Sequence, residues 1–398
     1  MPQIWAGVDA GKTHHHCVVI DDQANRLLSR RVANDEPELL RLLTDVLALA
    51  GDEPVTWAAD LADGGAALLI GVLTAHDQRL LYIPGMTVNR ASAGYRGQGK
   101  TDARDAAVIA DQARVRRDLN PIRPGDEIAV ELSLLTARRS DLVTDRTRSI
   151  NRLRDLLVRI FPALERELDL TNRGPLVLLT GYQTPAALRR AGRARLETWL
   201  RSRKVRSAAQ LTQSAVQAAE RQHTMLPGEK ITAHLVQKLA EEVMTLNGQI
   251  EEIEQLIESR FRQHQHAEVL LSLPGVGVAL AAEFLAATGG DMACFGTADR
   301  LASFAGLAPV PFDSGRIQGN LHRPKRYHRR LQRVFFMSAL ISIRSCPESR
   351  RFYDRKRDEG KRHNQAVLAL ARRRVNVLWA LLRDGRCYEP APPVTLAA

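Results

Sequence analysis

Short apolar runs alternate with amphipathic segments over the first third of the chain. Five of these runs predict strands at residues 4–8, 17–20, 26–32, 55–59 and 79–83. Helical periodicity between and after them predicts helices at residues 36–50, 64–75 and 102–117, the last with Thr101 as its N-cap. Three early strands followed by alternating helices and strands indicate an α/β domain with a mixed sheet over residues 1–125.

Strand signals disappear from about Glu127 onward, and the middle of the chain is helical in pattern. A long helix is expected up to Pro162. In a second helix, apolar positions step alternately by three and four over about three heptads, which is typical of a coiled-coil seam. The seam consists of Val236, Leu239, Val243, Leu246, Ile250, Ile253 and Ile257. We assign residues 126–265 to a helical, coiled-coil dimerisation region, in which the seam packs within the chain or against a second copy.

The C-terminal third begins with a Gly-rich turn and continues into helices. Leu273-Pro274-Gly275-Val276-Gly277 before an apolar helix matches a helix-hairpin-helix turn, in which Gly275 and Gly277 let backbone N–H groups approach a DNA phosphate. A tight turn without a ligand is the alternative. We assign residues 266–388 to a mainly helical C-terminal domain and 389–398 to a frayed tail.

Positive charge is concentrated near the C-terminus. The chain of 398 residues has 57 Lys and Arg against 45 Asp and Glu, but residues 1–127 hold 14 against 18 and residues 314–386 hold 20 against 5. Such a stretch fits a polyanion, because each cation placed on a phosphate releases condensed counterions. A solvated basic face is the alternative. The candidate nucleic-acid contacts are Arg316, Lys325, Arg326, Arg329, Arg330 and Arg333.

Composition excludes several other classes. Hydrophobic residues make up 44% and charged residues 26% of the chain, which is ordinary for a folded protein. No apolar run approaches the roughly 18–20 residues of a membrane span. The four cysteines are scattered, which argues against a disulfide framework and against a zinc ribbon. We therefore expect a cytoplasmic protein that does not act in a membrane.

Four aspartates form the main candidate site. Asp9 and Asp60 each end a predicted apolar strand, and ligands of α/β sheets bind at the carboxyl ends of strands. Asp102 and Asp105 share one face at the start of a predicted helix. Two carboxylates 4 Å apart repel by about 4 kcal/mol at an effective dielectric near 20. Divalent cations remove this repulsion, so the pattern predicts a Mg²⁺ site able to act on a phosphodiester.

Neighbouring motifs leave alternatives open. Gly11-Lys12-Thr13 lacks the first glycine of a phosphate-binding P-loop, because Ala6 stands there. The segment Gly7–Lys12 also resembles the first phosphate loop of actin-like ATPases, which is a rival reading. His14-His15-His16 is expected to be a polar, partly exposed strand edge, since consecutive strand residues point to opposite faces and cannot converge on one ion.

A candidate nucleophile lies at the entrance to the basic stretch. In Asp313-Ser314-Gly315-Arg316, the glycine would permit close approach of Ser314 to a phosphodiester. Arg316, Lys325 and Arg326 would then stabilise the charge that develops on the phosphate. Most loop serines cap or turn the chain, and the residues alone do not decide between these roles.

The order of these motifs resembles a known family. The four acidic positions resemble the ribonuclease-H-like nuclease core. Together with Thr101–Ala106, Leu273–Gly277, Phe304–Pro309 and the Ser314-Gly315 pair before the basic tail, they resemble the DEDD transposases of the insertion-sequence-one-ten family. This family comprises serine recombinases guided by a bridge RNA and is similar to the Piv/MooV invertases.

The resemblance implies a fold, a mechanism and partners. It implies a RuvC-like N-terminal domain in which Asp9, Asp60, Asp102 and Asp105 bind Mg²⁺, and a C-terminal domain whose Ser314 forms a covalent phosphoserine with DNA. It also implies double-stranded donor and target DNA, a structured guide RNA, and a homodimer or tetramer in which one subunit's serine completes another's acidic site. The family usually has Glu at the second acidic position, whereas Asp60 stands here, and the nearby Asp63 is a competitor for that role. The base that deprotonates Ser314 is not identified.

Two other functions remain as alternatives. The first is a RuvC-like Holliday-junction nuclease that uses metal-activated water, and the second is a non-catalytic nucleic-acid-binding scaffold.

Overall fold

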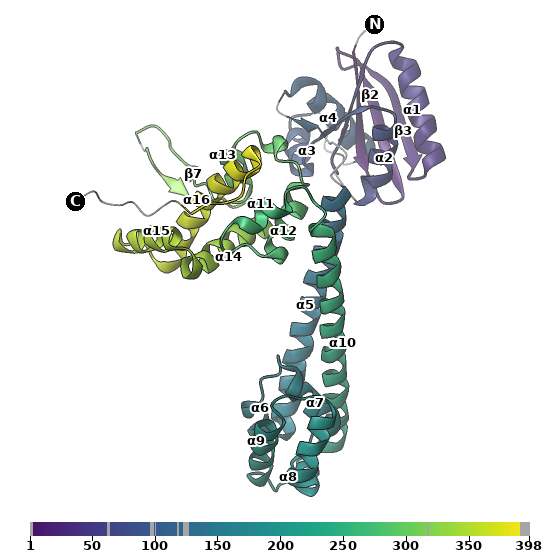
Figure 1. Cartoon of the computed structure of the whole chain (residues 1–398). Helices are drawn as coiled ribbons and strands as arrows, with labels where there is room; N and C mark the ends of the chain where they lie inside the picture. The colour runs from purple at the N-terminus through teal and green to yellow at the C-terminus, as the bar shows by residue number, and fades with distance from the viewer. Residues whose placement is uncertain are drawn as a thin grey trace, which may run out of the picture. The chain divides into compact units, whose positions relative to one another are not determined.

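A six-stranded mixed sheet forms the centre of the N-terminal unit, Met1–Gly125 (Figure 1). The computed structural model describes residues 3–61, 64–95, 99, 101–117, 119–121, 127–316 and 318–390. The strand order is β3-β2-β1-β4-β5-β6, in which β1, β4 and β5 are parallel and the other pairings are antiparallel. The strands are β1 (Ile4–Ala10), β2 (His14–Ile20), β3 (Arg26–Ala33), β4 (Val55–Ala59), β5 (Arg79–Tyr82) and β6 (Asn120–Pro121).

Helices cover both faces of this sheet. On one face, α1 (Glu36–Ala50) and α2 (Ala67–Ala75) pack on side chains such as Val8 and Trp57. On the other face, Trp5 and Ala58 contribute to a core with α3 (Gly85–Ser92) and α4 (Asp102–Val115). Because successive strand residues point to opposite faces, the burial of every residue of β4 reflects a strand covered on both sides. The predicted α/β domain with a mixed sheet is confirmed.

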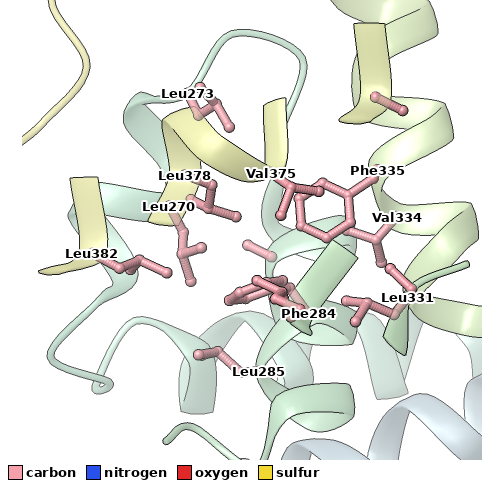
Figure 2. Close-up of a cluster of buried hydrophobic side chains, with 14 of the residues drawn as sticks. Leu270, Leu273, Phe284, Leu285, Leu331, Val334, Phe335, Val375, Leu378 and Leu382 are labelled. Carbon is pink, nitrogen blue, oxygen red and sulfur yellow. The ribbon is translucent and has the colours of Figure 1, made fainter. Parts of the chain in front are cut away.

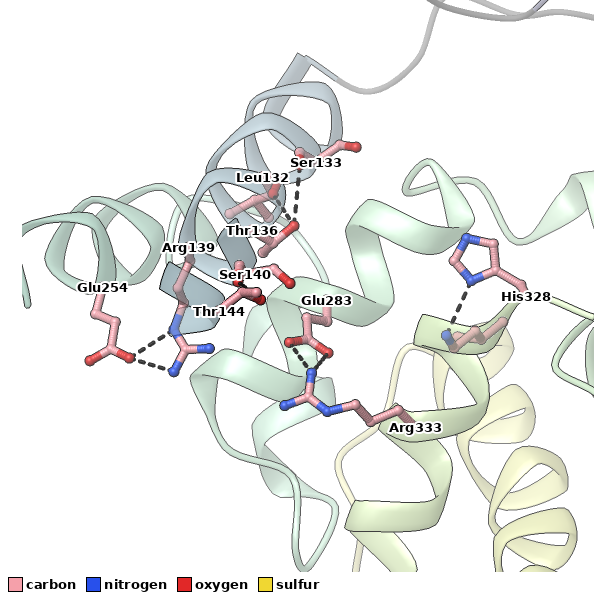
Figure 3. A network of polar contacts seen from close by, with 11 residues as sticks. Leu132, Ser133, Thr136, Arg139, Ser140, Thr144, Glu254, Glu283, His328 and Arg333 are labelled. Carbon is pink, nitrogen blue, oxygen red and sulfur yellow. Dashed lines mark hydrogen bonds and ion pairs between the residues drawn. The ribbon is translucent and has the colours of Figure 1, made fainter. Parts of the chain in front are cut away.

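Two helices of more than 30 residues organise the beginning of the second unit, Asp126–Ala398. These helices are α5 (Glu127–Ile160) and α10 (Glu229–Phe261). Leu132 shares a core with Phe261, whereas Leu157 shares another core with Val236, so the two helices run antiparallel. Arg139 of α5 is paired with Glu254 of α10 at 2.6 Å (Figure 3). The apolar stripe of α10 is therefore used, at least in part, for packing within the chain.

Four shorter helices form a cap at the far end of this α5–α10 hairpin. They are α6 (Pro162–Glu167), α7 (Arg173–Gly181), α8 (Pro185–Ser202) and α9 (Ala208–Glu220). Their leucines and alanines build one core with the end of α5 and the start of α10. Gly192 interrupts α8 with a φ of 68° and a ψ of 167°, so the helix is kinked there. The segment that gave only a weak helical signal is thus a packed helical cap.

The C-terminal part is a helical bundle around a large apolar core (Figure 2). Phe284 and Phe335 meet edge to face in this core, with ring centroids 6.0 Å apart. The helices are α11 (Ala267–Ser272), α12 (Val278–Thr288), α13 (Ala298–Phe304), α14 (Arg329–Ser345), α15 (Pro347–Asp358) and α16 (His363–Asp384). Mainly helical structure after the sheet domain is confirmed.

Several local predictions are wrong. A short hairpin of β7 (Val310–Pro311) and β8 (Leu321–His322) interrupts the region expected to lack strands, because two-residue strands are too short to produce a periodic signal. The three histidines do not lie at a sheet edge, since β2 pairs with β1 on one side and β3 on the other. His15 is only 1% exposed, whereas His14 is exposed and His16 is half-buried, so the expected partial exposure is confirmed at these two residues. Within the described ranges, every helix is too short or too polar to span a lipid bilayer.

Candidate active site

Close packing of α4 on β1 places the acidic motif of α4 beside the end of β1. A Cβ atom on Gly7 would lie only 2.3 Å from the carbonyl oxygen of Ala106, so no side chain fits there. Thr101 caps α4, with its hydroxyl accepting a hydrogen bond from the Arg104 N–H at 3.2 Å. Asp102 and Asp105 therefore lie in the first turn of a helix that crosses the sheet near Asp9.

All four predicted aspartates line one pocket of about 590 Å³. Asp9 lies at the end of β1, and Asp60 follows β4, the parallel neighbour of β1. Asp102 and Asp105 reach the same pocket from α4. Strands that run parallel end at the same edge of a sheet, and this geometry brings residues far apart in the sequence together. The alternative second acid, Asp63, lies outside the described residues.

The pocket perturbs the ionisation of Asp60. Burial raises the pKa of its carboxyl group, and the negative charge of Asp105 raises it further. The backbone N–H of Ala10 donates to Asp60 Oδ1 at 3.1 Å, which opposes these effects. The shift is consistent with acidic groups that repel one another in a partly buried space.

The pocket has the donor chemistry for a hard divalent cation, which prefers carboxylate oxygens. In the described part of the chain, however, no three His, Cys, Asp or Glu side chains are close enough together to form a metal site. Burial is the main cause of the raised pKa of Asp60, and the charge of Asp105 adds to it, so a nearby cation would stabilise the ionised carboxylate. The residues thus fit a divalent metal by chemistry, while the geometry for coordinating it is not formed.

Arg104 and α3 contribute to the pocket and were missed in the sequence. The guanidinium of Arg104 donates to the carbonyl oxygens of Gly99 (2.7 Å), Ser92 (3.0 Å) and Tyr95 (3.1 Å). It thereby ties the segment after α3 to the acidic helix. Asn89 also lines the pocket from α3. The position of Arg104 between two candidate acids was a possible signal, but its three partners are set by the tertiary structure.

Two histidines of β2 lie close to the acidic residues. His15 Nδ1 accepts a hydrogen bond from the backbone N–H of Gly11 at 3.2 Å, and this contact helps to hold the turn after β1. Burial lowers the pKa of His15, and the nearby charge of Asp60 opposes the shift. Burial also lowers the pKa of His16, with Asp102 opposing it. Both imidazoles are therefore held towards their neutral form.

Ser314 lies in the exposed segment between β7 and β8. This segment is organised locally, since Asp313 Oδ1 accepts a hydrogen bond from the backbone N–H of Asn320 at 2.9 Å. Gly315, the next residue, has a φ of 56°, which an L side chain rarely adopts. The hydroxyl of Ser314 is thus presented on a tight, solvent-accessible turn.

The two glycines of the turn between α11 and α12 have different surroundings. Gly275 has a φ of 80°, and a Cβ atom there would lie 2.6 Å from the carbonyl oxygen of Ser338 on α14. Gly277 precedes α12 and is exposed, and no atom of the described residues lies within 4 Å of an added Cβ. Internal packing therefore explains Gly275, whereas Gly277 leaves room for an external group.

A buried arginine fixes this turn to the rest of the bundle. Arg374 of α16 donates from Nε to Ser338 Oγ at 2.9 Å and also donates to the carbonyl oxygen of Pro274. Burial lowers the pKa of its guanidinium to about 10. The turn is consequently held from the inside by α14 and α16.

The predicted nucleic-acid contacts do not all have the same surroundings. Arg316, Lys325, Arg326, Arg329 and Arg330 are exposed. Arg333 is exposed as well, but its guanidinium contacts both carboxylate oxygens of Glu283, at 2.7 and 2.9 Å (Figure 3). Part of its charge is therefore neutralised within the protein.

Comparison with known proteins gives the class of the chain. A family model described as "Transposase" matches residues 6–162, and one described as "Transposase IS116/IS110/IS902 family" matches residues 267–354. The α/β domain with its acidic pocket, joined to a basic helical unit, is thus that of a DNA transposase. A full-length relative in Mycobacterium paratuberculosis, named insertion element IS900 uncharacterized 42 kDa protein, is 61% identical over 99% of both chains. The chain belongs to the IS116/IS110/IS902 family of transposases.

Further similarities extend over the same length or over the N-terminal unit. The insertion element IS116 uncharacterized 44.8 kDa protein of Streptomyces clavuligerus is 51% identical over 100% of this chain and 98% of its own length. Among solved structures, T. thermophilus RuvC in complex with a Holliday junction substrate has a TM-score of 0.24 and 17% identity. That similarity covers 30% of this chain and 99% of RuvC.

Proposed function

We propose that this transposase cleaves and rejoins DNA strands at the acidic pocket of a RuvC-like N-terminal domain. One observation carries the proposal: Asp9, Asp60, Asp102 and Asp105, from three separate elements, line the same pocket. These carboxylates would hold Mg²⁺, with Asp60 rather than Asp63 as the second acid. When bound, the metal would supply electrophilic stabilisation of a phosphodiester.

The chain's own residues would shape the pocket for this chemistry. Arg104 fixes the segment after α3 beside the acidic helix through three carbonyl contacts. The contact from Ala10 N–H holds one oxygen of Asp60 in place. Such fixed groups lower the reorganisation needed when the substrate binds.

Ser314 would be the nucleophile. Its Oγ attacks the phosphorus of a DNA strand, the Oγ–P bond forms, and the bond from phosphorus to the leaving deoxyribose oxygen breaks. The serine proton passes to a base that we do not assign, and the leaving oxygen gains a proton. Attack by a hydroxyl of a second strand on the phosphoserine would then release the serine and join the strands. Exposed Arg316, Lys325 and Arg326 would stabilise the charge on the phosphate.

The proposed partners follow from the roles that we assign to the three regions of the chain. Residues 1–125 would hold the acidic site, 126–265 would mediate dimerisation, and 266–388 would carry the serine. In a homodimer or tetramer, the serine of one subunit would complete the acidic site of another. A structured guide RNA would choose the donor and target duplexes, with binding dominated by backbone contacts and shape.

Trapping DNA on the purified protein under denaturing conditions tests the nucleophile. With a duplex substrate and Mg²⁺, we expect a covalent protein–DNA adduct for the wild type and none for Ser314→Ala. Ser303→Ala, a serine of α13 outside the hairpin, is the matched control and should still form the adduct.

Two outcomes would contradict the proposal. An adduct that persists in Ser314→Ala would remove this serine as the nucleophile. Cleavage with free 5′-phosphate ends and no adduct would favour a RuvC-like nuclease that activates water at the same carboxylates. Sequencing the RNA that co-purifies with the protein tests guidance separately, and an RNA-free active complex would exclude it.

A further inference from the structure

A second basic surface lies on the helical cap at the far end of the α5–α10 hairpin. Residues 185–206 contain eight Lys or Arg and a single acidic residue, Glu197. Seven of these cations are exposed, and we call them the α8 basic surface: Arg190, Arg193, Arg195, Arg201, Arg203, Lys204 and Arg206. This density of positive charge is independent of the basic stretch at residues 314–386.

Packing of the cap accounts for only some of the cations on α8 and the turn after it. The apolar side of α8 is buried through Leu188, Leu196 and Leu200. The eighth cation, Arg189, has a structural role, since its guanidinium donates to the carbonyl oxygens of Ala219 (2.6 Å) and Gln222. The guanidinium of Arg203 also contributes to packing, since it lies 3.9 Å from the ring centroid of Trp199. The other exposed cations include Arg190, Arg193 and Arg195 of α8.

Acidic side chains of the protein neutralise little of the positive charge on the α8 basic surface. Glu197 pairs with Arg201 at 2.5 Å. As far as the described residues extend, Arg190, Arg193 and Arg195 form no ion pair with an acidic side chain. Like charges held close together on a surface repel one another, so the arrangement costs stability unless an anion is bound there.

The backbone holds the surface in a defined shape. The kink at Gly192 separates Arg190 from Arg193, so these two cations flank a break in the helix. Lys204 adopts a φ of 59° in the turn that follows α8. Arg173 of α7 donates to the carbonyl oxygen of Arg203 at 3.1 Å and fixes that turn. The cations are therefore presented on a kinked helix and on the turn that follows it.

A cavity of about 850 Å³ adjoins one end of this surface. Arg173, Lys204 and Arg206 line it together with Glu167 and Asp169, so the cavity itself has mixed charge. Asp169 is occupied with the hydrogen bonds of the 169–172 turn. The excess of positive charge lies on α8, outside the cavity, which fits an extended polyanion better than a small anion.

We propose that the α8 basic surface binds the phosphate backbone of duplex DNA. Arginine is suited to this role, because its planar guanidinium contacts phosphate oxygens in pairs. DNA is chosen as the occupant because the chain is a transposase. The proposal concerns binding alone and does not depend on the chemistry of Ser314.

The length of the hairpin predicts how far along DNA this contact lies. Leu132 belongs to the C-terminal core and Leu157 to the core of the cap, and both lie on α5. At a rise of about 1.5 Å per residue, they are roughly 38 Å apart, close to one turn of B-DNA at about 34–36 Å. These two residues mark the two ends of the hairpin and do not belong to the basic surfaces. If a duplex runs along the hairpin, it has to exceed about 12 base pairs to contact both basic surfaces at once.

Salt-dependent binding of the full chain tests the proposal. Fluorescence anisotropy would measure affinity for labelled DNA duplexes of about 12 and 40 base pairs across a series of KCl concentrations. The variant is Arg190→Gln/Arg193→Gln/Arg195→Gln. The matched control is Arg148→Gln/Arg152→Gln/Arg159→Gln, which removes three exposed arginines from α5.

We expect the α8 variant to lose about two to three units of the salt slope on the 40-base-pair duplex, since each phosphate contact contributes about 0.9. Affinity at 0.15 M salt should fall about tenfold or more, with little change on the short duplex. The control should match the wild type. Arg190→Lys/Arg193→Lys/Arg195→Lys keeps the charge and should restore most of the salt slope.

Equal affinity and salt slope for the α8 variant and the α5 control would overturn the proposal. A loss confined to an RNA duplex of the same length would overturn the choice of DNA. An equal loss on both DNA lengths would overturn the predicted spacing. Far-UV circular dichroism shows whether the glutamine variant folds. If it does not fold, the lysine variant tests the proposal instead, and weak DNA binding by a folded lysine variant would contradict the proposal.

Discussion

At the scale of single residues, two glycines of one turn have separable roles. Gly275 needs a left-handed backbone and has the α14 backbone against it, whereas Gly277 has an ordinary φ and open space. Their sequence context, Pro-Gly-Val-Gly, gave them the same expected role in phosphate binding. The difference depends on α14, which lies more than 50 residues further along the chain.

Substituting each glycine by alanine tests this separation. Gly275→Ala should lower the free energy of unfolding by about 2–4 kcal/mol, because the new Cβ meets backbone atoms that cannot move aside cheaply. Gly277→Ala should change it by less than about 0.5 kcal/mol. Urea denaturation measures both, and equal effects would contradict the assignment of Gly275 to packing.

Asp60 gives a prediction about stability and pH. Its pKa is raised in the folded protein, so the folded state binds a proton more readily than the unfolded state does. Above the raised pKa, the ionised carboxylate therefore costs stability, and this cost disappears as the pH falls through it. Asp60→Asn should raise the melting temperature of metal-free protein at pH 7, because it removes the cost of the ionised carboxylate.

The gain should shrink as the pH is lowered towards the ordinary range of an aspartate, because the wild type then becomes neutral at this position too. Thermal unfolding in the presence of a chelator, repeated from pH 7 to pH 4, measures it. Asp22→Asn, an exposed aspartate in the same unit, is the control and should have no effect. A melting temperature that falls in Asp60→Asn would contradict the electrostatic account.

At the scale of elements, the sequence predicts best those that are buried on both faces or strongly periodic. The apolar runs of β1 and β4 and the heptad pattern of α10 predict these elements from local sequence alone. By contrast, α3 buries a single described residue, Val88, and its sequence has no clear period. The hairpin of β7 and β8 is exposed, and each of its strands is only two residues long. Such elements depend on tertiary contacts that local sequence does not encode.

The acidic pocket follows the same division. The meeting of Asp9, Asp60, Asp102 and Asp105 could be predicted, because two parallel strands end at one edge and a helix begins nearby. The contacts of Arg104 with three carbonyl oxygens could not, since they require the path of the chain after α3. The raised pKa of Asp60 also depends on burial and on Asp105, which become apparent only in the fold.

The α5–α10 hairpin makes a testable claim about packing. Leu153 of α5 is fully buried in the core of the cap, whereas Val158, five residues further along, is 47% exposed. Leu153→Ala should cost about 2–5 kcal/mol of unfolding free energy, because it removes buried surface and leaves a cavity. Val158→Ala should cost well under 1 kcal/mol, and similar losses in urea denaturation would mean that this face of α5 is not packed as described.

At the scale of the whole molecule, charge is divided between the parts of the chain. Residues 1–127 carry four more acidic than basic residues, and the remainder carries 16 more basic than acidic ones. An acidic pocket repels DNA phosphates, so the affinity for DNA has to come mainly from the basic unit, and a cation bound in the pocket would offset the repulsion there. Binding and cleavage should therefore respond to different substitutions.

The C-terminal arginines test this division. Arg329→Gln/Arg330→Gln removes two exposed cations and should reduce the salt slope of DNA binding by about 1.8. Arg333→Gln should reduce the salt slope by less than the roughly 0.9 expected for one phosphate contact, because Glu283 already neutralises part of the charge of Arg333. Anisotropy titrations in KCl measure both, and a larger effect from Arg333 would contradict the ion pair's role.

The central claim is that the four-aspartate pocket binds the divalent metal used in DNA cleavage. The most direct measurement is Mn²⁺ binding to the full chain by electron paramagnetic resonance, with Mn²⁺ in place of Mg²⁺. We predict that Asp105→Asn weakens binding at least tenfold, a loss of about 1.4 kcal/mol, while Asp22→Asn binds like the wild type. Unchanged Mn²⁺ affinity in Asp105→Asn and in Asp9→Asn would contradict the account.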